Sequence, residues 1–437
     1  MSAQESAIRK ASVRLVPFLC LLYFISYLDR VNIGFAALQM NADVGISAAA
    51  YGLGASMFFV GYLLFEVPSN LVMEKVGARR WLARIMITWG LASVAMMFVV
   101  GEKSLYAIRF LLGVAEAGFF PAVIVHLSHW FPRANRARVT GLFFIAVPLS
   151  SVLGAPVSTA LLDYTHGFGG LQGWQWMFLL EGLPAVLIGI SCLWYLVDRP
   201  AEAKWLTPQE ARSLQDVLDR EKAETEAQRK YHFLEVFTHP RVVILALVLL
   251  LTVSGSYGVG FWMPQIIKLF TTSNMAVGWI TSGIYLLSVL GMIGLTRYSD
   301  ATGQRVAPVA ISTAVGGIGF LLCMSHFDSP MIAITGLAIA CMGTFSALPV
   351  FWTNPSTFLT GTAAAVAIAF INSAAQLSGI AVPWFIGLSR EATGGFEMAI
   401  GGLGLSLFLA SAAILCFKML GGAAAAAAAS RSAKIAP

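Results

Sequence analysis

Long apolar stretches, each of roughly 20 residues, recur along the whole chain. An α-helix rises about 1.5 Å per residue, so each stretch is long enough to cross the hydrocarbon core of a bilayer, which is about 30 Å thick. Twelve such stretches occur, at residues 15–37, 51–72, 82–100, 104–126, 139–162, 174–197, 242–263, 278–298, 307–324, 330–350, 362–388 and 397–418. The pattern therefore predicts an all-α membrane protein with twelve transmembrane helices.

The overall composition excludes an ordinary soluble domain. Of the 437 residues, 58% are hydrophobic and 11% are charged, whereas soluble domains carry about 25% charged residues. The five cysteines all fall in apolar stretches and show no metal-ligand spacing. We therefore expect neither a disulfide framework nor a metal site.

Lys and Arg are unevenly distributed between the predicted loops. Of the 28 in the chain, 23 lie in the two terminal segments and the loops on one side of the membrane, and 3 lie on the other side. The positive-inside rule places the side richer in Lys and Arg in the cytoplasm. We expect a multi-pass protein of the bacterial inner membrane, with both termini cytoplasmic. The same distribution explains the net charge of +6 without a nucleic-acid partner.

The segment 198–240 has the composition of a soluble surface helix. Thr207, Pro208 and Glu210 form a capping-box pattern that marks the start of an amphipathic helix. We interpret this segment as a cytoplasmic linker between one six-helix bundle at 1–197 and a second at 241–420. The alanine-rich tail at 421–437 is expected to be disordered.

The two predicted bundles share a loop motif at an offset of 226 residues. The motif follows the second span of each half and contains an acid, a glycine and arginine in register. We interpret it as a tight turn whose charges latch neighbouring helix ends, and so as a pair of gating loops formed by Glu74, Gly77, Arg79 and Arg80 and by Asp300, Gly303 and Arg305. The alternative is that these charges only anchor the loops in the cytoplasm.

Two six-span halves, a long central loop and this motif resemble the major facilitator superfamily. The resemblance covers roughly residues 10–420. It implies two pseudo-symmetric six-helix bundles that hold a substrate near the membrane midplane and alternate the side from which it is accessible.

Ionisable residues inside the spans are functional candidates, because a charge in the membrane costs several kcal/mol. All of them fall in the first half of the chain, at Asp29, Arg30, Glu66, Arg109, Glu116 and Glu181. We therefore expect charge chemistry in the first half and neutral contacts in the second. Glu66 and Glu181 are interpreted as structural or gating residues, although their roles stay open.

Helical spacing groups some of these residues. Tyr27 and Arg30 share one stripe of the first span, and Asp29 is turned by about 100° toward a neighbouring helix. Arg109 and Glu116 are seven residues apart, which places them on one face, roughly 10 Å apart along the axis. The alternative is that these charges pair only to stabilise helix packing.

The strings Tyr27–Asn32 and Arg109–Pro121 resemble the anion:cation symporter branch of the superfamily. The longer string from Asp29 to Leu38, with Glu66–Asn70, is most similar to its tartrate-transporter group. The resemblance implies that Arg30 binds a substrate carboxylate and that Asp29 pairs with Arg109. It also implies that Asp29 and Glu116 carry coupling protons.

The same resemblance favours Trp352 and Asn372 as cavity residues of the second half. Tyr257 is a further candidate, and Tyr27 and Tyr62 would complete the wall of the first half. Core packing is the competing interpretation for Trp352 and Tyr257.

We expect a monomeric, H⁺-coupled symporter that takes up a small organic anion. A hydroxy-carboxylate such as tartrate or a sugar acid is favoured, and an aromatic carboxylate of the phthalate or hydroxyphenylacetate type is the alternative. An exporter of cationic drugs is disfavoured by Arg30. A membrane enzyme is disfavoured because the sequence has no nucleophile cluster or soluble catalytic domain. No cofactor is expected, and Na⁺ stays open as the coupling ion.

Overall fold

The computed structural model describes residues 2–227, 237–355 and 361–435. In this part of the chain, twelve helical segments are long and apolar enough to cross a membrane. They are Ala3–Asp43, Ala48–Val76, Ala78–Phe98, Glu102–Ser128, Ala146–Tyr164, Gly173–Tyr195, Pro240–Lys268, Asn274–Thr302, Val306–Ser325, Pro330–Phe351, Val366–Thr393 and Glu397–Leu420. The predicted fold class and its twelve spans are confirmed.

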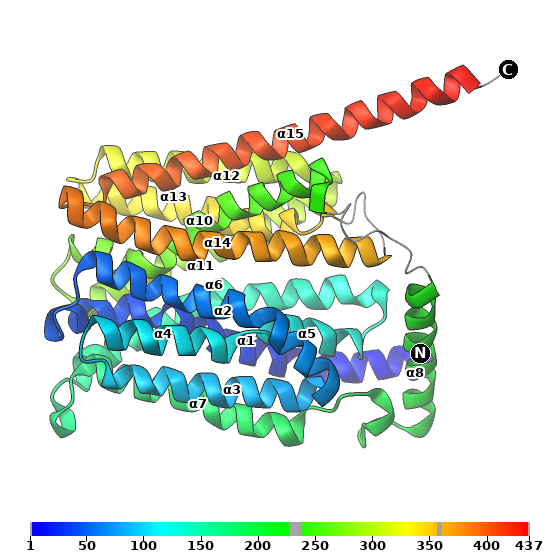
Figure 1. The fold of residues 1–437 in the computed structure, drawn as a ribbon, viewed down its shortest axis with the longest axis horizontal. Helices are drawn as coiled ribbons and strands as arrows, with labels where there is room; N and C mark the ends of the chain where they lie inside the picture. Colours follow the sequence, from blue (N-terminus) through cyan, green and yellow to red (C-terminus); the bar gives the residue numbers. More distant parts are fainter. Residues whose placement is uncertain (1, 228–236, 356–360, 436–437) are drawn as a thin grey trace. The chain divides into compact units, whose positions relative to one another are not determined.

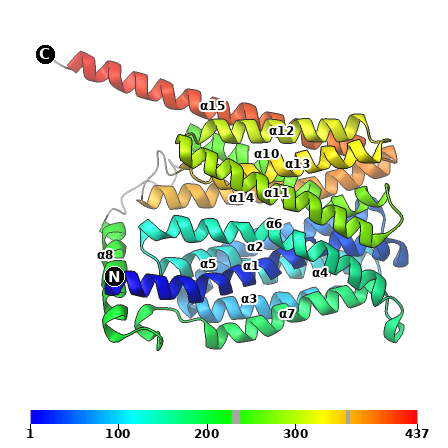
Figure 2. The ribbon, with the colours of Figure 1, turned by 180° about the vertical axis from the view of Figure 1, so that it is seen from behind.

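Two compact units can be distinguished by their internal contacts. The first unit comprises Met1–Gln228, Gly260–Leu286 and Pro383–Gly394. Its helices are α1 (Ala3–Asp43), α2 (Ala48–Val76), α3 (Ala78–Ala95), α4 (Glu102–Glu116), α5 (Phe119–Ser128), α6 (Arg133–Tyr164), α7 (Gly173–Tyr195) and α8 (Pro208–Ala227). Helix α3 packs along α7, α2 along α4, and α1 along α6 (Figures 1 and 2).

The second unit comprises Arg229–Val259, Leu287–Val382 and Gly395–Pro437. The helices of the second half are α10 (Pro240–Lys268), α11 (Asn274–Thr302), α12 (Val306–Ser325), α13 (Pro330–Phe351), α14 (Gly361–Thr393) and α15 (Glu397–Ile435). In this unit α12 packs against both α13 and α15. The predicted bundle boundaries, 1–197 and 241–420, and the disorder of 421–437 stay predictions.

The fourth span is two helices and not the single helix expected from residues 104–126. Helix α4 ends at Glu116, and α5 begins at Phe119. Gly118 between them has a φ of 87°, a left-handed conformation that glycine adopts without steric cost. The break places Glu116 at the very end of α4.

The predicted capping box of the linker helix is confirmed. The Thr207 amide donates to Glu210 at 2.9 Å, and the Glu210 amide donates to the Thr207 hydroxyl at 3.2 Å. Glu210 also accepts from Ser6 at 2.7 Å and from Lys10 at 2.8 Å, so α8 is tied across the first turns of α1 (Figure 1). The Lys10 hydrogen bond, with those of Ser6 and Thr207, lowers the pKa of Glu210 to about 2.

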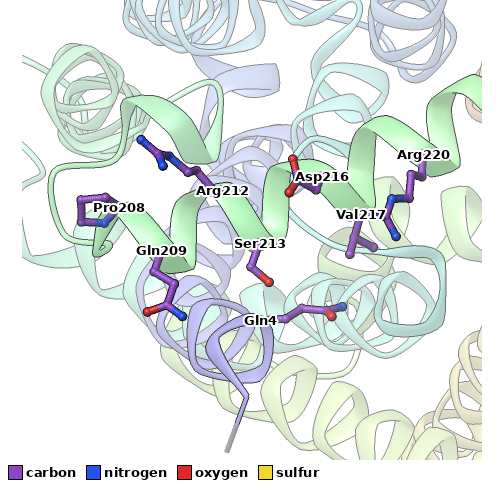
Figure 3. A pocket seen from close by; sticks show the side chains of 8 residues that line it. All are labelled: Gln4, Pro208, Gln209, Arg212, Ser213, Asp216, Val217 and Arg220. Atoms are coloured by element: carbon purple, nitrogen blue, oxygen red, sulfur yellow. The ribbon is translucent and has the colours of Figure 1, made fainter.

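A polar groove lies where α8 meets the start of α1. Figure 3 shows its side chains, which come from α8 apart from Gln4. Gln4 is 26 residues before Arg30, which is roughly 39 Å along a continuous helix axis. The groove is therefore remote from the charged residues of the membrane spans.

Candidate functional site

Arg30 and Glu116 form a buried ion pair between α1 and α4. The Nη2 atom of Arg30 contacts the Oε1 atom of Glu116, and the two residues are 8% and 1% exposed. Ser26, one turn before Arg30, also donates to Glu116 Oε1 at 3.1 Å. The structure thus brings together two residues that the sequence analysis assigned separately to substrate binding and proton coupling.

Three aromatic rings surround the Arg30 guanidinium. Its Cζ atom lies 4.9 Å from the ring centre of Tyr27, 5.1 Å from that of Phe58 and 5.7 Å from that of Tyr62. Cation–π contacts of this kind stabilise a desolvated cation by up to about 2 kcal/mol each. Tyr27 and Tyr62 were expected here. Phe58 was missed, although its position one turn before Tyr62 was a usable signal.

Close packing of α2 on α4 sets this geometry. A Cβ atom on Gly113 would collide with the carbonyl oxygen of Phe58 and would lie 2.9 Å from the Tyr62 amide nitrogen. Only glycine allows the two backbones to approach this closely. Gly113 therefore brings Phe58 and Tyr62 next to the end of α4, where Glu116 meets Arg30.

Arg109 is buried beside the same aromatic cluster. It is 1% exposed, and its Cζ lies 5.1 Å from the Phe58 ring centre and 5.9 Å from that of Phe261. Its Nε and Nη2 atoms have no hydrogen-bond partner among the described residues. Two charged donors therefore remain available.

The expected pair between Asp29 and Arg109 is not formed. Asp29 is turned toward α3, where its Oδ2 accepts from Trp89 Nε1 at 2.9 Å and its Oδ1 accepts from Ser93 Oγ at 3.0 Å. Asn32 Nδ2 adds a longer bond of 3.3 Å to Oδ1. The physical reason is the angle of about 100° between successive helical residues, which directs Asp29 and Arg30 to different neighbours.

Glu66 and Glu181 are both buried. Glu66, on α2, is 6% exposed and interacts electrostatically with Arg30. Glu181, on α7, is 3% exposed, and its Oε1 accepts from Ser158 at 2.6 Å. Glu181 thus interacts electrostatically with Asp29, and Glu66 with Arg30.

The two predicted gating loops use their charges differently. In the first unit, Gly77 has a φ of 92°, and the Arg79 amide donates to Asp198 at 2.8 Å, while Glu74 and Arg80 are exposed. In the second unit, Gly303 has a φ of 69°, and Arg305 pairs with Asp300 at 2.6 Å. The tight glycine turn is present in both loops, but the acid of the first latch is Asp198 and not Glu74.

The second-half candidates belong to the second compact unit. Tyr257 donates to Gln376 at 2.9 Å, and Asn372 is half-buried one turn before Gln376 on α14. Trp352 follows α13 and packs edge-on against Phe351, with ring centres 5.4 Å apart. Tyr257, Asn372 and Gln376 form a polar strip, whereas Trp352 joins an apolar cluster. A cavity shared with Arg30 stays a prediction.

Twelve membrane-spanning helices with charged side chains buried inside them are typical of membrane transporters. Residues 19–383 match the Major Facilitator Superfamily, and the chain belongs to this family. It is 45% identical to a "Putative tartrate transporter" of Agrobacterium vitis, over 92% of this chain and 91% of that protein. It is 40% identical to a quinolone resistance transporter of Acinetobacter baumannii, over 95% of each.

A solved structure of the xylose transporter XylE from E. coli has the same fold. It superimposes with a TM-score of 0.73 at 15% identity and covers 94% of this chain and 98% of XylE. At this identity the likeness concerns the fold alone.

Proposed function

We propose that this chain takes up a small hydroxy-carboxylate, most simply tartrate, together with protons. The observation that carries the proposal is Arg30, a buried cation with a carboxylate partner and an aromatic surround. In this proposal the protein acts in the bacterial inner membrane with both termini cytoplasmic.

The chemistry of Arg30 suits a carboxylate ligand. Arginine stays charged in proteins and offers a planar fork of donors that matches the two oxygens of a carboxylate. In the structure, Glu116 occupies part of this fork. A substrate carboxylate therefore takes the place of a side-chain carboxylate with the same chemistry.

The pairing also supports proton coupling. When Glu116 is protonated, it loses the negative charge that holds Arg30, and the guanidinium becomes available to the anion. Proton binding and anion binding thus favour each other, and by linkage each raises the affinity for the other. Coupled uptake requires this cooperation.

Arg109 supports an acid with two carboxylates. The Cζ atoms of Arg30 and Arg109 each lie 5.1 Å from the Phe58 ring centre, so they are at most about 10 Å apart. A short dicarboxylate with one end on each guanidinium spans a gap of this order. The names of two relatives at 45% and 46% identity also refer to tartrate.

The aromatic surround of Arg30 supports a second candidate class. Tyr27, Phe58 and Tyr62 offer ring faces to an aromatic acid of the phthalate or hydroxyphenylacetate type. One relative is named for quinolone resistance, and quinolones are aromatic carboxylic acids. Export of an aromatic acid is therefore a further candidate function.

A binding screen on purified protein separates these classes. The panel contains tartrate stereoisomers, a monocarboxylic sugar acid, phthalate, hydroxyphenylacetate and a quinolone, each tested by thermal shift and calorimetry. The proposal expects tartrate to bind best and to accumulate in proteoliposomes when the outside is acidified. Tighter binding of phthalate or the quinolone, with no response to tartrate, overturns it.

A further inference from the structure

Asp29 and Glu181 are two buried acids of the first unit that lack a cationic partner. They lie on α1 and α7 and are 1% and 3% exposed. Within the described residues, neither makes an ion pair. The charged side chains with the largest effect on Asp29 are Glu181 and, more weakly, Glu116, both of them acidic. Two adjacent buried carboxylates without a cation are costly, and binding a proton or a cation offsets that cost.

The hydrogen bonds show where that charge belongs. Asp29 already accepts from Trp89, Ser93 and Asn32. Glu181 accepts from Ser158 through Oε1, but its Oε2 has no partner among the described residues. The Oδ1 atom of Asn32 also has no partner, and the Asn32 side chain lies beside Glu181 as well as Asp29. Glu181 Oε2 and Asn32 Oδ1 are thus two buried oxygens without a donor among the described residues, on side chains that lie beside each other.

We propose that Glu181 is a proton-binding site, with the proton on Oε2 donated to Asn32 Oδ1. One proton then satisfies both orphan oxygens and neutralises one of the two acids. Asn32 connects the site to Asp29, because its Nδ2 donates to Asp29 at 3.3 Å, and in this proposal its Oδ1 accepts from Glu181. This site is separate from the Arg30–Glu116 pair, because none of its printed hydrogen bonds reaches Arg30 or Glu116.

The charge of Glu181 can also affect Arg30, the proposed substrate-binding residue. Release of the proton places a second negative charge beside Asp29, so that α1 and α7 repel each other. Asp29 is adjacent to Arg30 in α1, and any shift of that turn moves the guanidinium. A role for this shift in uptake rests on the proposed function, whereas proton binding by Glu181 does not.

A sodium ion is the competing occupant. It requires several oxygen ligands in one shell, and both oxygens of Asp29 are already directed at N–H and O–H donors. The two orphan oxygens alone are too few for such a shell. A proton needs one acceptor besides Glu181, and Asn32 supplies it.

Infrared spectroscopy of the purified full-length protein tests the site without any substrate. At neutral pH the wild type is expected to show the C=O stretch of a protonated carboxyl group, and Glu181→Gln is expected to lose it. Ser158→Ala keeps Glu181 but removes the donor to its Oε1, so the band should move to higher frequency. Glu116→Gln is the matched control and should leave the band in place, because Glu116 is paired with Arg30.

Three results overturn the proposal. The first is a band that persists in Glu181→Gln. The second is a band that does not move in Ser158→Ala, a variant that tests the site even if Glu181→Gln does not purify. The third is the absence of any band together with a thermal stability of the wild type that is raised by NaCl but not by choline chloride. That result assigns the site to sodium. Because no tartrate is used, failure of the transport proposal leaves these readouts intact.

Discussion

Arg30 and Asp29 are adjacent in the chain, yet their side chains belong to different networks. Arg30 pairs with Glu116 on α4, whereas Asp29 accepts hydrogen bonds from Trp89 and Ser93 on α3. A single turn of α1 therefore carries both the cation of the Arg30–Glu116 pair and a buried acid that contacts α3. The predictions below test the consequences of this separation.

Arg30→Lys is expected to abolish uptake. Lysine keeps the charge but loses the planar fork, and a charged hydrogen bond is worth about 1.5–3 kcal/mol, so tartrate affinity should fall roughly 10- to 100-fold. Calorimetry measures the affinity, and gel filtration checks that the variant still purifies as a monomer. Transport close to wild type would remove Arg30 from the substrate site.

Glu116→Gln is expected to separate binding from coupling. Glutamine has the shape of the protonated acid, so substrate should bind, and counterflow exchange, which needs no net proton movement, should persist. Accumulation driven by an imposed pH gradient should fail. Asp29→Asn is the companion variant and is expected to behave alike. If Glu116→Gln accumulates substrate as the wild type does, the residue serves packing only.

Gly113→Ala is expected to destabilise the protein by about 1–3 kcal/mol, the usual cost of overpacking. The added methyl group meets the Phe58 carbonyl and forces α2 away from α4. Gly283→Ala is the matched control, since a Cβ there meets nothing within 4 Å and alanine favours a helix by about 1 kcal/mol. Thermal unfolding compares the two variants. Equal melting temperatures would mean that the α2–α4 contact tolerates a side chain.

The tie between α8 and α1 is expected to depend on pH through Glu210. Its pKa is lowered to about 2 by the Lys10 hydrogen bond, so the contact is fully present above the ordinary value near 4.5 and is lost as the pH falls toward 2. Hydrogen exchange of α8 amides should quicken over that window. Glu210→Gln should show fast exchange already at neutral pH, and protection equal to the wild type would contradict the assignment.

The membrane spans and the charged residues within them were predictable, because hydropathy depends on each segment alone. The stripe of Tyr27 and Arg30 and the turn of Asp29 toward a neighbouring helix followed from the period of one helix. The partners of these side chains did not follow from that period, because the acid that meets Arg30 depends on how α1 and α4 are rotated against each other. The Asp29–Arg109 pair failed for this reason. The partnership of Asn32 with Glu181 joins residues 149 positions apart and has no local signal.

The break at Gly118 and the proline at position 121, which has no N–H, leave the carbonyls of Ala115 and Ala117 without an acceptor role inside the helix. Ser69 of α2 donates to the carbonyl of Ala117 at 2.6 Å, and Arg84 of α3 donates to that of Ala115 at 3.3 Å. These bonds hold the end of α4 in a fixed position against α2 and α3. Glu116, the acid that pairs with Arg30, is therefore carried by a fixed segment of backbone, and in the proposed mechanism a proton that binds there changes the charge of the pair without moving the backbone.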